Sequence, residues 1–264
     1  MATTNSKSFR SYLHQRSDTG NKYSSGRLLI DAGSAQFPGA GVLTVGGARR
    51  GGAGYINYLS RESLPTELIL HAYPDVVPLH SADGIDGQDF DALVVGPGSP
   101  KISSLPAGSR LVIDGGALAL VTTPAPAHQL WVLTPHEGEV KKMGFDPSDR
   151  RSCAERLARD VNAVVLLKGR HSLVATPQGI LYTDQVAGSE LSTAGTGDVL
   201  AGFIGSMIAS HRPSSLNQAG EITAHALEIY SAAGRSATKR RTPLVATDLL
   251  DEIPRLLAQE GTFL

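Results

Sequence analysis

The sequence contains a single cysteine, Cys153, and its aromatic residues make up only 5% of the 264 positions. One cysteine cannot form an internal disulfide, and a metal centre built from several thiolates is likewise excluded. The formal net charge is only −1, so the chain lacks the basic surplus with which proteins neutralise the phosphates of nucleic acids. We therefore predict no nucleic-acid partner.

Long apolar runs are also missing. Residues 1–25 are polar throughout, and the stretch 115–136, although free of Asp, Glu, Lys and Arg, contains three prolines. Proline interrupts the continuous helix that a membrane span requires, and a polar start is unlike a secretory leader. We predict a cytoplasmic protein without membrane contact, in which residues 1–25 form a flexible arm and residues 26–264 form one domain.

Hydrophobic residues account for 41% of the chain, which is ample for a packed core. Several short apolar runs end in glycine-rich turns and alternate with helical patterns, which predicts an α/β fold with a mostly parallel sheet between helices. The strands are expected at Leu28–Ala32, Tyr55–Leu59, Leu68–Ala72, Ala92–Val95, Leu111–Ile113, Leu130–Leu133 and Val164–Leu167, with a hairpin over 171–183. The helices are expected to end near residue 50 and to span about 146–161, 199–210, 216–236 and 247–259.

A glycine-bounded motif, Gly195-Thr196-Gly197-Asp198, precedes one of these helices. The glycines permit a tight loop, and the amide groups and positive dipole end of the helix favour an anion there. We expect this field to keep Asp198 ionised, as a base beside a bound phosphate. The alternative is that Asp198 only caps a buried helix, and the motif alone leaves both interpretations open.

Four further motifs accompany Gly195–Asp198 at compatible spacing: Lys168-Gly169, Thr134–Glu139, Val94–Gly98 and Ala246–Leu250. Together the five resemble the ribokinase-like superfamily and, within it, the ADP/ATP-dependent NAD(P)H-hydrate dehydratase family, which also forms the carboxyl-terminal domain of bifunctional NAD(P)HX repair proteins. The resemblance runs from about residue 26 to residue 257. The chain departs from the usual family pattern at Gly98-Ser99-Pro100, at Asp114-Gly115-Gly116 and at Tyr230–Gly234.

The resemblance implies a ribokinase-like three-layer sandwich and a lyase that returns hydrated NADH or NADPH (NAD(P)HX) to NAD(P)H. Phosphorylation of the ring hydroxyl by ADP or ATP, with Mg²⁺, would turn a poor leaving group into a good one before elimination. It also implies a homo-oligomer, with a tetramer favoured, and possible cooperation with a separate NAD(P)HX epimerase. The sequence does not decide between ADP and ATP as the phosphate donor, or between the hydrates of NADH and NADPH as the substrate.

The family's site residues map onto positions of this sequence. Asp198 would be the catalytic base. The nucleotide would contact Lys168, Gly169, Arg170, His171, Ser172, Gly195, Thr196 and Gly197, and the hydrated dinucleotide would contact Ala40, Gly98, His136 and Asp198. No protein ligand set for the metal is visible.

Three acidic residues near these motifs have two interpretations each. Asp114 follows a predicted strand, where it either contacts a ligand or forms a turn. Glu137 and Glu139 fit a general acid or a magnesium ligand, but helix capping is the favoured interpretation.

Two other functions share the same loop. The runner-up is a ribokinase-like kinase of a vitamin precursor or sugar, and the third hypothesis is a nucleotide-binding regulatory protein without activity. The Thr134–Glu139 segment and the Ala246-Thr247-Asp248 ending favour the dehydratase over the kinase.

Overall fold

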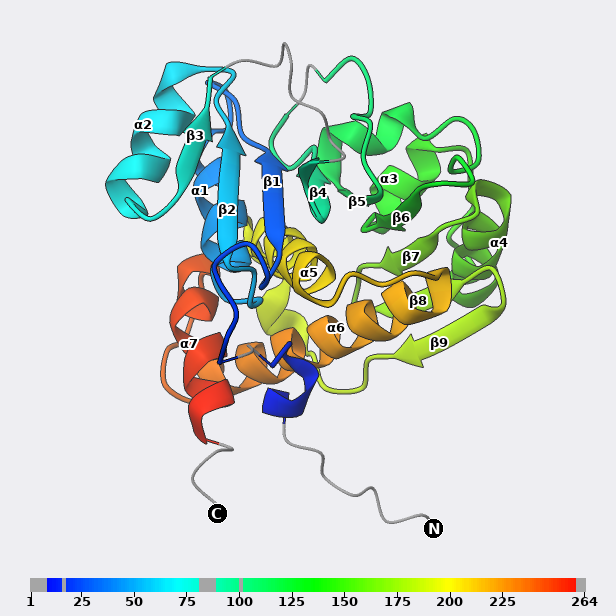
Figure 1. The fold of residues 1–264 in the computed structure, drawn as a ribbon. Helices are drawn as coiled ribbons and strands as arrows, with labels where there is room; N and C mark the ends of the chain where they lie inside the picture. Colours follow the sequence, from blue (N-terminus) through cyan, green and yellow to red (C-terminus); the bar gives the residue numbers. More distant parts are fainter. Residues whose placement is uncertain (1–8, 16–17, 81–88, 100–101, 260–264) are drawn as a thin grey trace.

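A nine-stranded sheet lies at the centre of the protein in the order β3-β2-β1-β4-β5-β6-β7-β8-β9 (Figure 1). The computed structural model describes residues 9–15, 18–80, 89–99 and 102–259. The strands from β3 to β7 pair in parallel, whereas β8 and β9 add an antiparallel hairpin. The strands are β1 (Arg27–Asp31), β2 (Tyr55–Leu59), β3 (Val77–Leu79), β4 (Ala92–Val95), β5 (Arg110–Ile113), β6 (Leu130–Leu133), β7 (Val164–Leu167), β8 (Leu173–Thr176) and β9 (Gly179–Thr183).

Helices cover both faces of the sheet (Figure 1). One face carries α1 (Pro38–Ala48), α2 (Ser63–Ala72), α5 (Thr196–His211), α6 (Leu216–Thr238) and α7 (Ala246–Gln259). The other carries the 3-10 helix η3 (Gly115–Leu120) with α3 (Glu137–Lys142) and α4 (Arg150–Val161). The predicted α/β sandwich with a mostly parallel sheet is therefore confirmed.

Alternate strand residues supply the two cores, because successive side chains of a strand point to opposite faces. Leu28 and Ile30 of β1 pack into the core under α5 and α6, while Leu29 packs into the core under α4. Cys153 is buried in that second core, as its position on a predicted helix indicates. Burial on both faces explains why these strands are short, nearly continuous apolar runs.

The prediction of a strand at Leu68–Ala72 is wrong, because these residues form the second half of helix α2. The buried residues of α2 are Pro65, Thr66 and Ile69, spaced as on one side of a helix. A short apolar run does not distinguish a strand from a buried helix segment. The actual edge strand, Val77–Leu79, has only three residues and was not predicted.

The start of α4 also differs from the prediction. Asp149, not Asp146, caps this helix, and its carboxylate accepts hydrogen bonds from the amides of Arg151 and Ser152. Asp146 instead closes a turn by accepting from the amide and the hydroxyl of Ser148. Both aspartates have cap-like surroundings, and only the backbone path decides which one begins the helix.

The predicted arm is described over residues 9–15 and 18–25, and this part lies against the domain. Residues Phe9–Tyr12 form a 3-10 turn, and the ring of Tyr12 stacks on His225 of α6 with centroids 3.8 Å apart. Arg212 donates to the carbonyls of Tyr23 and Ser24 at 2.9 Å each. The division into an arm and one domain stays a prediction. Among the described residues, no helix has the length and apolar content needed to cross a membrane.

The carboxyl ends of five parallel strands meet at one edge of the sheet. The residues that follow them are Ala32 after β1, Gly96 after β4, Asp114 after β5, Thr134 after β6 and Lys168 after β7. Open parallel sheets bind their ligands at this edge. The fold therefore gathers most of the predicted site residues in one place.

Candidate active site

A buried ion pair lies at the centre of this edge. The ammonium of Lys168 is 2.7 Å from a carboxylate oxygen of Asp114, which also accepts a 2.7 Å hydrogen bond from the hydroxyl of Thr134. Asp114 is only 3% exposed. Burial alone would lower the pKa of Lys168, but the carboxylates of Asp114 and Glu139 outweigh it and raise that pKa. Lys168 is therefore held as a fixed positive charge.

The amino end of α5 lies beside this ammonium. Gly195 caps the helix in the left-handed conformation, with φ of 88°, which favours glycine. A methyl group at Gly197 would lie 3.3 Å from the Lys168 ammonium. Among the described residues no acceptor is found for the amides of Gly197 and Asp198, as expected in the first turn of a helix. Free amides and one ammonium together form an anion site.

The Asp198 carboxylate stands in the first turn of α5 but does not cap it. No side chain caps this helix, and within the described part of the chain no hydrogen bond or ion pair holds the Asp198 carboxylate. Burial and the nearby carboxylate of Asp114 raise the pKa of Asp198 to about 7, although Lys168 opposes them. The capping interpretation is thus contradicted. Because burial and the second carboxylate act against ionisation, Asp198 is mostly ionised only above about pH 7.

The loop after β7 is rigidly built. The hydroxyl of Ser172 donates to the carbonyl of Gly169 at 3.0 Å and accepts from its amide at 3.2 Å. Arg150, from α4, donates to the carbonyls of Leu167 and His171 at 3.2 and 3.3 Å. A side chain at Gly169 would meet this guanidinium within 2.5 Å. A larger residue at position 169 would therefore displace the Arg150 guanidinium from these carbonyls.

A cavity of about 890 Å³, hereafter the larger cavity, opens beside this loop. It brings together most of the predicted nucleotide residues, which lie far apart in the sequence. Its lining includes Lys168, Gly169, Arg170, His171, Ser172, Thr196 and Gly197, together with His136. Gly195 and Asp198 are not part of the lining, although each is next to a residue that is.

Helix α6 contributes a wall of the larger cavity that the motifs did not indicate. The hydroxyl of Tyr230 donates to the carbonyl of Thr196 at 2.8 Å, and the hydroxyl of Ser231 donates to the buried carboxylate of Asp184 at 2.6 Å. Asp184 in turn accepts from the amide of Val186, whose carbonyl accepts from Arg235. The signal in the sequence is the segment Tyr230–Gly234, where the chain departs from the usual family pattern.

His136 and the two glutamates near it serve the amino end of α3. His136 caps this helix by accepting from the amides of Gly138 and Glu139 at 3.0 and 3.3 Å, and the Glu139 carboxylate accepts from the His136 amide. Glu137 pairs with Arg150. The favoured capping interpretation is confirmed for Glu139. The exposed side chain of His136 still reaches the larger cavity.

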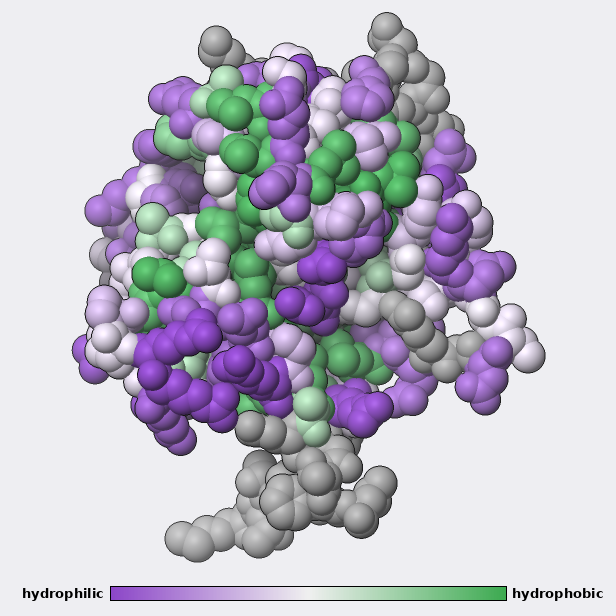
Figure 2. Space-filling model, turned by 90° about the vertical axis from the view of Figure 1, so that its left-hand side faces the viewer, coloured by the Kyte–Doolittle hydropathy of each residue, from purple (hydrophilic) through white to green (hydrophobic). Residues whose placement is uncertain are grey.

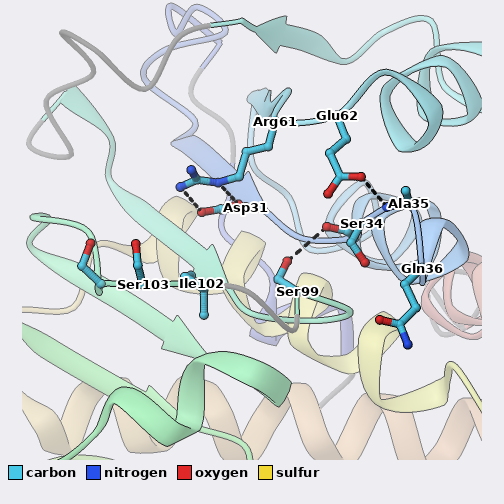
Figure 3. A pocket seen from close by; sticks show the side chains of 11 residues that line it. Asp31, Ser34, Ala35, Gln36, Arg61, Glu62, Ser99, Ile102 and Ser103 are labelled. Carbon is cyan, nitrogen blue, oxygen red and sulfur yellow. Dashed lines mark hydrogen bonds and ion pairs between the residues drawn. The ribbon is translucent and has the colours of Figure 1, made fainter.

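A smaller cavity of about 450 Å³ lies over the carboxyl ends of β1 and β4. Asp31 holds the guanidinium of Arg61 through two hydrogen bonds of 2.9 and 2.8 Å (Figure 3). On the opposite side, the carboxylate of Glu62 accepts from the amide of Ala35 (Figure 3). Neither Arg61 nor Asp31 was singled out by the motifs, because the two lie 30 positions apart.

Ala40 and Gly98, the other predicted substrate residues, touch each other beside the smaller cavity. A methyl group at Gly98 would lie 2.3 Å from the Ala40 side chain, and Ser99 lines the smaller cavity. One turn along α1, Leu43 comes within 2.4 Å of where a side chain at Gly195 would begin. Helix α1 therefore joins the smaller cavity to the start of α5. The departure at Pro100 lies outside the described residues.

The donor groups do not form a metal cage. Within the described ranges, no group of three or more His, Cys, Asp or Glu side chains could hold a metal ion. A divalent cation used here would have to be bound mainly by phosphate oxygens and water, as Mg²⁺ commonly is.

Comparison with known proteins agrees with this geometry. The model of the NAD(P)H-hydrate dehydratase family matches residues 28–255. The bifunctional NAD(P)H-hydrate repair enzyme Nnr of Gloeobacter violaceus is 35% identical over 251 residues, covering 87% of this chain and 48% of that protein. The chain thus spans about half the length of this relative and of the Nnr enzyme of Salinibacter ruber.

Solved structures give the same result for the fold. The ADP/ATP-dependent NAD(P)H-hydrate dehydratase of Bacillus subtilis, co-crystallised with ATP and Mg²⁺, superposes with a TM-score of 0.82 at 26% identity over 96% of each chain. A ribokinase-like superfamily protein from Enterococcus faecalis superposes with a TM-score of 0.79 at 19% identity, covering 96% of this chain and 93% of that one. The predicted ribokinase-like architecture is therefore confirmed.

Proposed function

Because the chain belongs to the NAD(P)H-hydrate dehydratase family, we propose that it removes water from hydrated NADH or NADPH at the expense of ADP or ATP. The observation that carries this proposal is the Asp198 carboxylate. It lies beside free amides and a fixed ammonium, it has no hydrogen-bond partner among the described residues, and its pKa is about 7. A general base works best when its pKa is near the working pH.

The two cavities lie on opposite sides of this carboxylate along the sheet edge. The larger cavity takes the nucleotide through the 168–172 loop and the amides at the start of α5. The smaller cavity, with Ala40 and Gly98 beside it, lies toward β1, on the other side of β5 and its Asp114. Two ligands bound in this way would meet at Asp198.

The reaction then needs two steps. In the first step Asp198 accepts the proton of the ring hydroxyl, and the hydroxyl oxygen forms a bond to the terminal phosphorus of the nucleotide. The bond between that phosphorus and the bridging oxygen of the nucleotide breaks at the same time. The bond from the ring carbon to the phosphate oxygen then breaks and phosphate leaves with the electron pair. The neighbouring carbon gives a proton to water, and the electrons of its C–H bond form the double bond between the two carbons. Lys168 and the amides of Gly197 and Asp198 would stabilise the charge on the transferred phosphoryl group. Mg²⁺, bound by phosphate oxygens, would supply further neutralisation.

The setting of the enzyme is part of the same proposal. We infer a cytoplasmic homo-oligomer, with a tetramer favoured, acting beside a separate epimerase of hydrated NAD(P)H. Helix α2 lies on the side of the molecule seen in Figure 2, where apolar patches interrupt the polar surface. It exposes Leu64 and Leu68 by 44% and 40%, one turn apart. Exposed apolar side chains of this kind favour contact with another subunit, and light scattering would measure the mass of the assembly.

One assay distinguishes the three candidate functions. The protein is incubated with hydrated NADH, magnesium and ADP or ATP, and the absorbance of reduced nicotinamide is followed. Recovery of NADH that is lost in Asp198→Asn supports the dehydratase. A phosphorylated product without recovery of NADH identifies a kinase, and tight nucleotide binding without either product identifies a regulatory protein.

The pH profile follows from the environment of Asp198. Since the base must be ionised to accept a proton, and its pKa is about 7, kcat/KM for the hydrated substrate should fall about tenfold per pH unit below that value and level off above it. Initial rates between pH 5.5 and pH 8.5 at saturating nucleotide would measure this. A profile flat down to about pH 5 would mean that Asp198 is an ordinary carboxylate and not the base.

A further inference from the structure

Asp114 is a buried charged group at the centre of the site, and the proposed mechanism gives it no task. One of its oxygens takes both the Lys168 ammonium and the Thr134 hydroxyl at 2.7 Å. Thr134 is itself buried, and its hydroxyl also lies 3.4 Å from the carbonyl of Ile113. The Asp114 side chain is therefore fixed by the residues that follow two other strands, the adjacent β6 and the next strand, β7.

Resting on the proposed function, we propose that Asp114 is a positioning residue of the phosphoryl-transfer site, because its carboxylate holds the Lys168 ammonium beside the first turn of α5. Without this partner a lysine stem of four carbons could reach several positions along the sheet edge. With it, the ammonium stays next to Gly197, where the transferred phosphoryl group would pass. Asp114 lines neither of the two cavities, and its influence on the site acts through Lys168 and Asp198.

The same carboxylate has a second consequence. Two carboxylates in one desolvated site cannot both ionise freely, so the charge on Asp114 favours a protonated Asp198, whereas Lys168 opposes that effect. The other charged or titratable groups that face Asp198 are Glu139 on α3 and Tyr230 on α6. Asp114 thus helps to keep Asp198 a base that can take up a proton at neutral pH.

The test measures the titration of Asp198 directly, in the complete protein without substrate. Carbon-13 NMR of labelled aspartate carboxylates gives the midpoint, and Asp198→Asn assigns the signal. In Asp114→Asn, which can still accept from Lys168 and Thr134, the midpoint should fall from about 7 by about one unit. The acid limb of kcat/KM should move by the same amount, an effect that a purely structural role would not produce.

Asp114→Asn leaves the buried Lys168 ammonium without its carboxylate partner, and the variant could fail to fold for that reason. A second pair of variants keeps the proposal testable in that case. Lys168→Met should raise the Asp198 midpoint, since the carboxylate of Asp114 is then uncompensated. The double variant Lys168→Met/Asp114→Asn removes both charges, which buried ion pairs usually tolerate better than loss of one partner, and should bring the midpoint down again by about one unit.

Equal midpoints in Lys168→Met and the double variant, or in wild type and Asp114→Asn, would overturn the role of Asp114. These measurements need no turnover. If wild type fails to dehydrate its substrate but the midpoints move as expected, the proposed function is wrong while the positioning role stands. If the wild type dehydrates its substrate but the midpoints do not move, the proposed function stands and the role of Asp114 is wrong.

Discussion

Replacement of Asp198 by asparagine is expected to lower the rate of NADH recovery by a factor of about 10² to 10⁴, the usual contribution of a general base. Asparagine keeps the size of the side chain but cannot take the proton of the ring hydroxyl. The nucleotide should still bind, because Lys168 and the amides at the start of α5 are unchanged. Single-turnover kinetics with saturating nucleotide, together with nucleotide affinity by calorimetry, would measure both effects.

The stability of this variant provides the control. The pKa of Asp198 is about 7 in the folded protein, whereas an ordinary aspartate has a pKa of 3.8. Between these pH values the folded state therefore binds more protons than the unfolded state. Stability therefore falls as the pH rises through this window. Asparagine cannot ionise, so Asp198→Asn should melt above wild type at pH 8 and close to it at pH 4.

Asp160→Asn is the matched change outside the site. Asp160 is half-exposed on α4, where it pairs with Arg156, and its loss should leave turnover unchanged. If Asp198→Asn unfolds at pH 8 or keeps its activity, Asp198 is a structural residue and the proposed mechanism fails.

Local patterns were sufficient for most of the fold. Val164–Leu167 is apolar at every position, so it had to be a strand buried on both faces, and the Lys-Gly that follows had to lie at the carboxyl edge. The same reasoning located β4, β5 and β6 and therefore most of the site residues. It failed at Leu68–Ala72, where a short apolar run suits a helix as well as a strand.

Contacts between residues far apart in the sequence could not be predicted from local patterns. Lys168 and Asp114 are 54 positions apart, and Ser231 and Asp184 are 47 apart. The spacing of each residue indicated that it ends a strand or faces a core, but not which partner it meets. The charge state of Asp198 depends on burial and on such a partner, Asp114, and neither can be inferred from the glycine-bounded motif alone.

The placement of Asp198 depends in turn on how closely α1 and α5 approach each other. A methyl group at Gly202 would lie 1.8 Å from the carbonyl oxygen of Thr44, and one at Gly47 would lie 2.1 Å from that of Val199. Contacts this short with backbone atoms cannot be relieved by a change of rotamer. The two glycines allow α1, with Ala40, to lie directly against the helix that begins at Asp198.

Gly202→Ala should therefore destabilise the protein by about 1–3 kcal/mol or more, the usual cost of overpacking a core. It should also raise KM for the hydrated dinucleotide, because α1 must move away from α5 and carry Ala40 with it. Nucleotide affinity should change less, since the larger cavity is formed mainly by the 168–172 loop, the 185–193 segment and α6. Urea denaturation and steady-state kinetics would measure the two effects.

Gly39→Ala is the matched control in the first turn of α1, because a methyl group there meets nothing within 4 Å and the backbone is ordinary. It should leave stability unchanged or slightly higher, since alanine restricts the unfolded chain more than glycine does. If Gly202→Ala were as stable and as active as Gly39→Ala, the close approach of the two helices would not be what holds Asp198 beside the substrate. If only Gly202→Ala loses stability, and its KM rises more for the dinucleotide than for the nucleotide, the close packing of α1 against α5 is what positions the substrate beside Asp198.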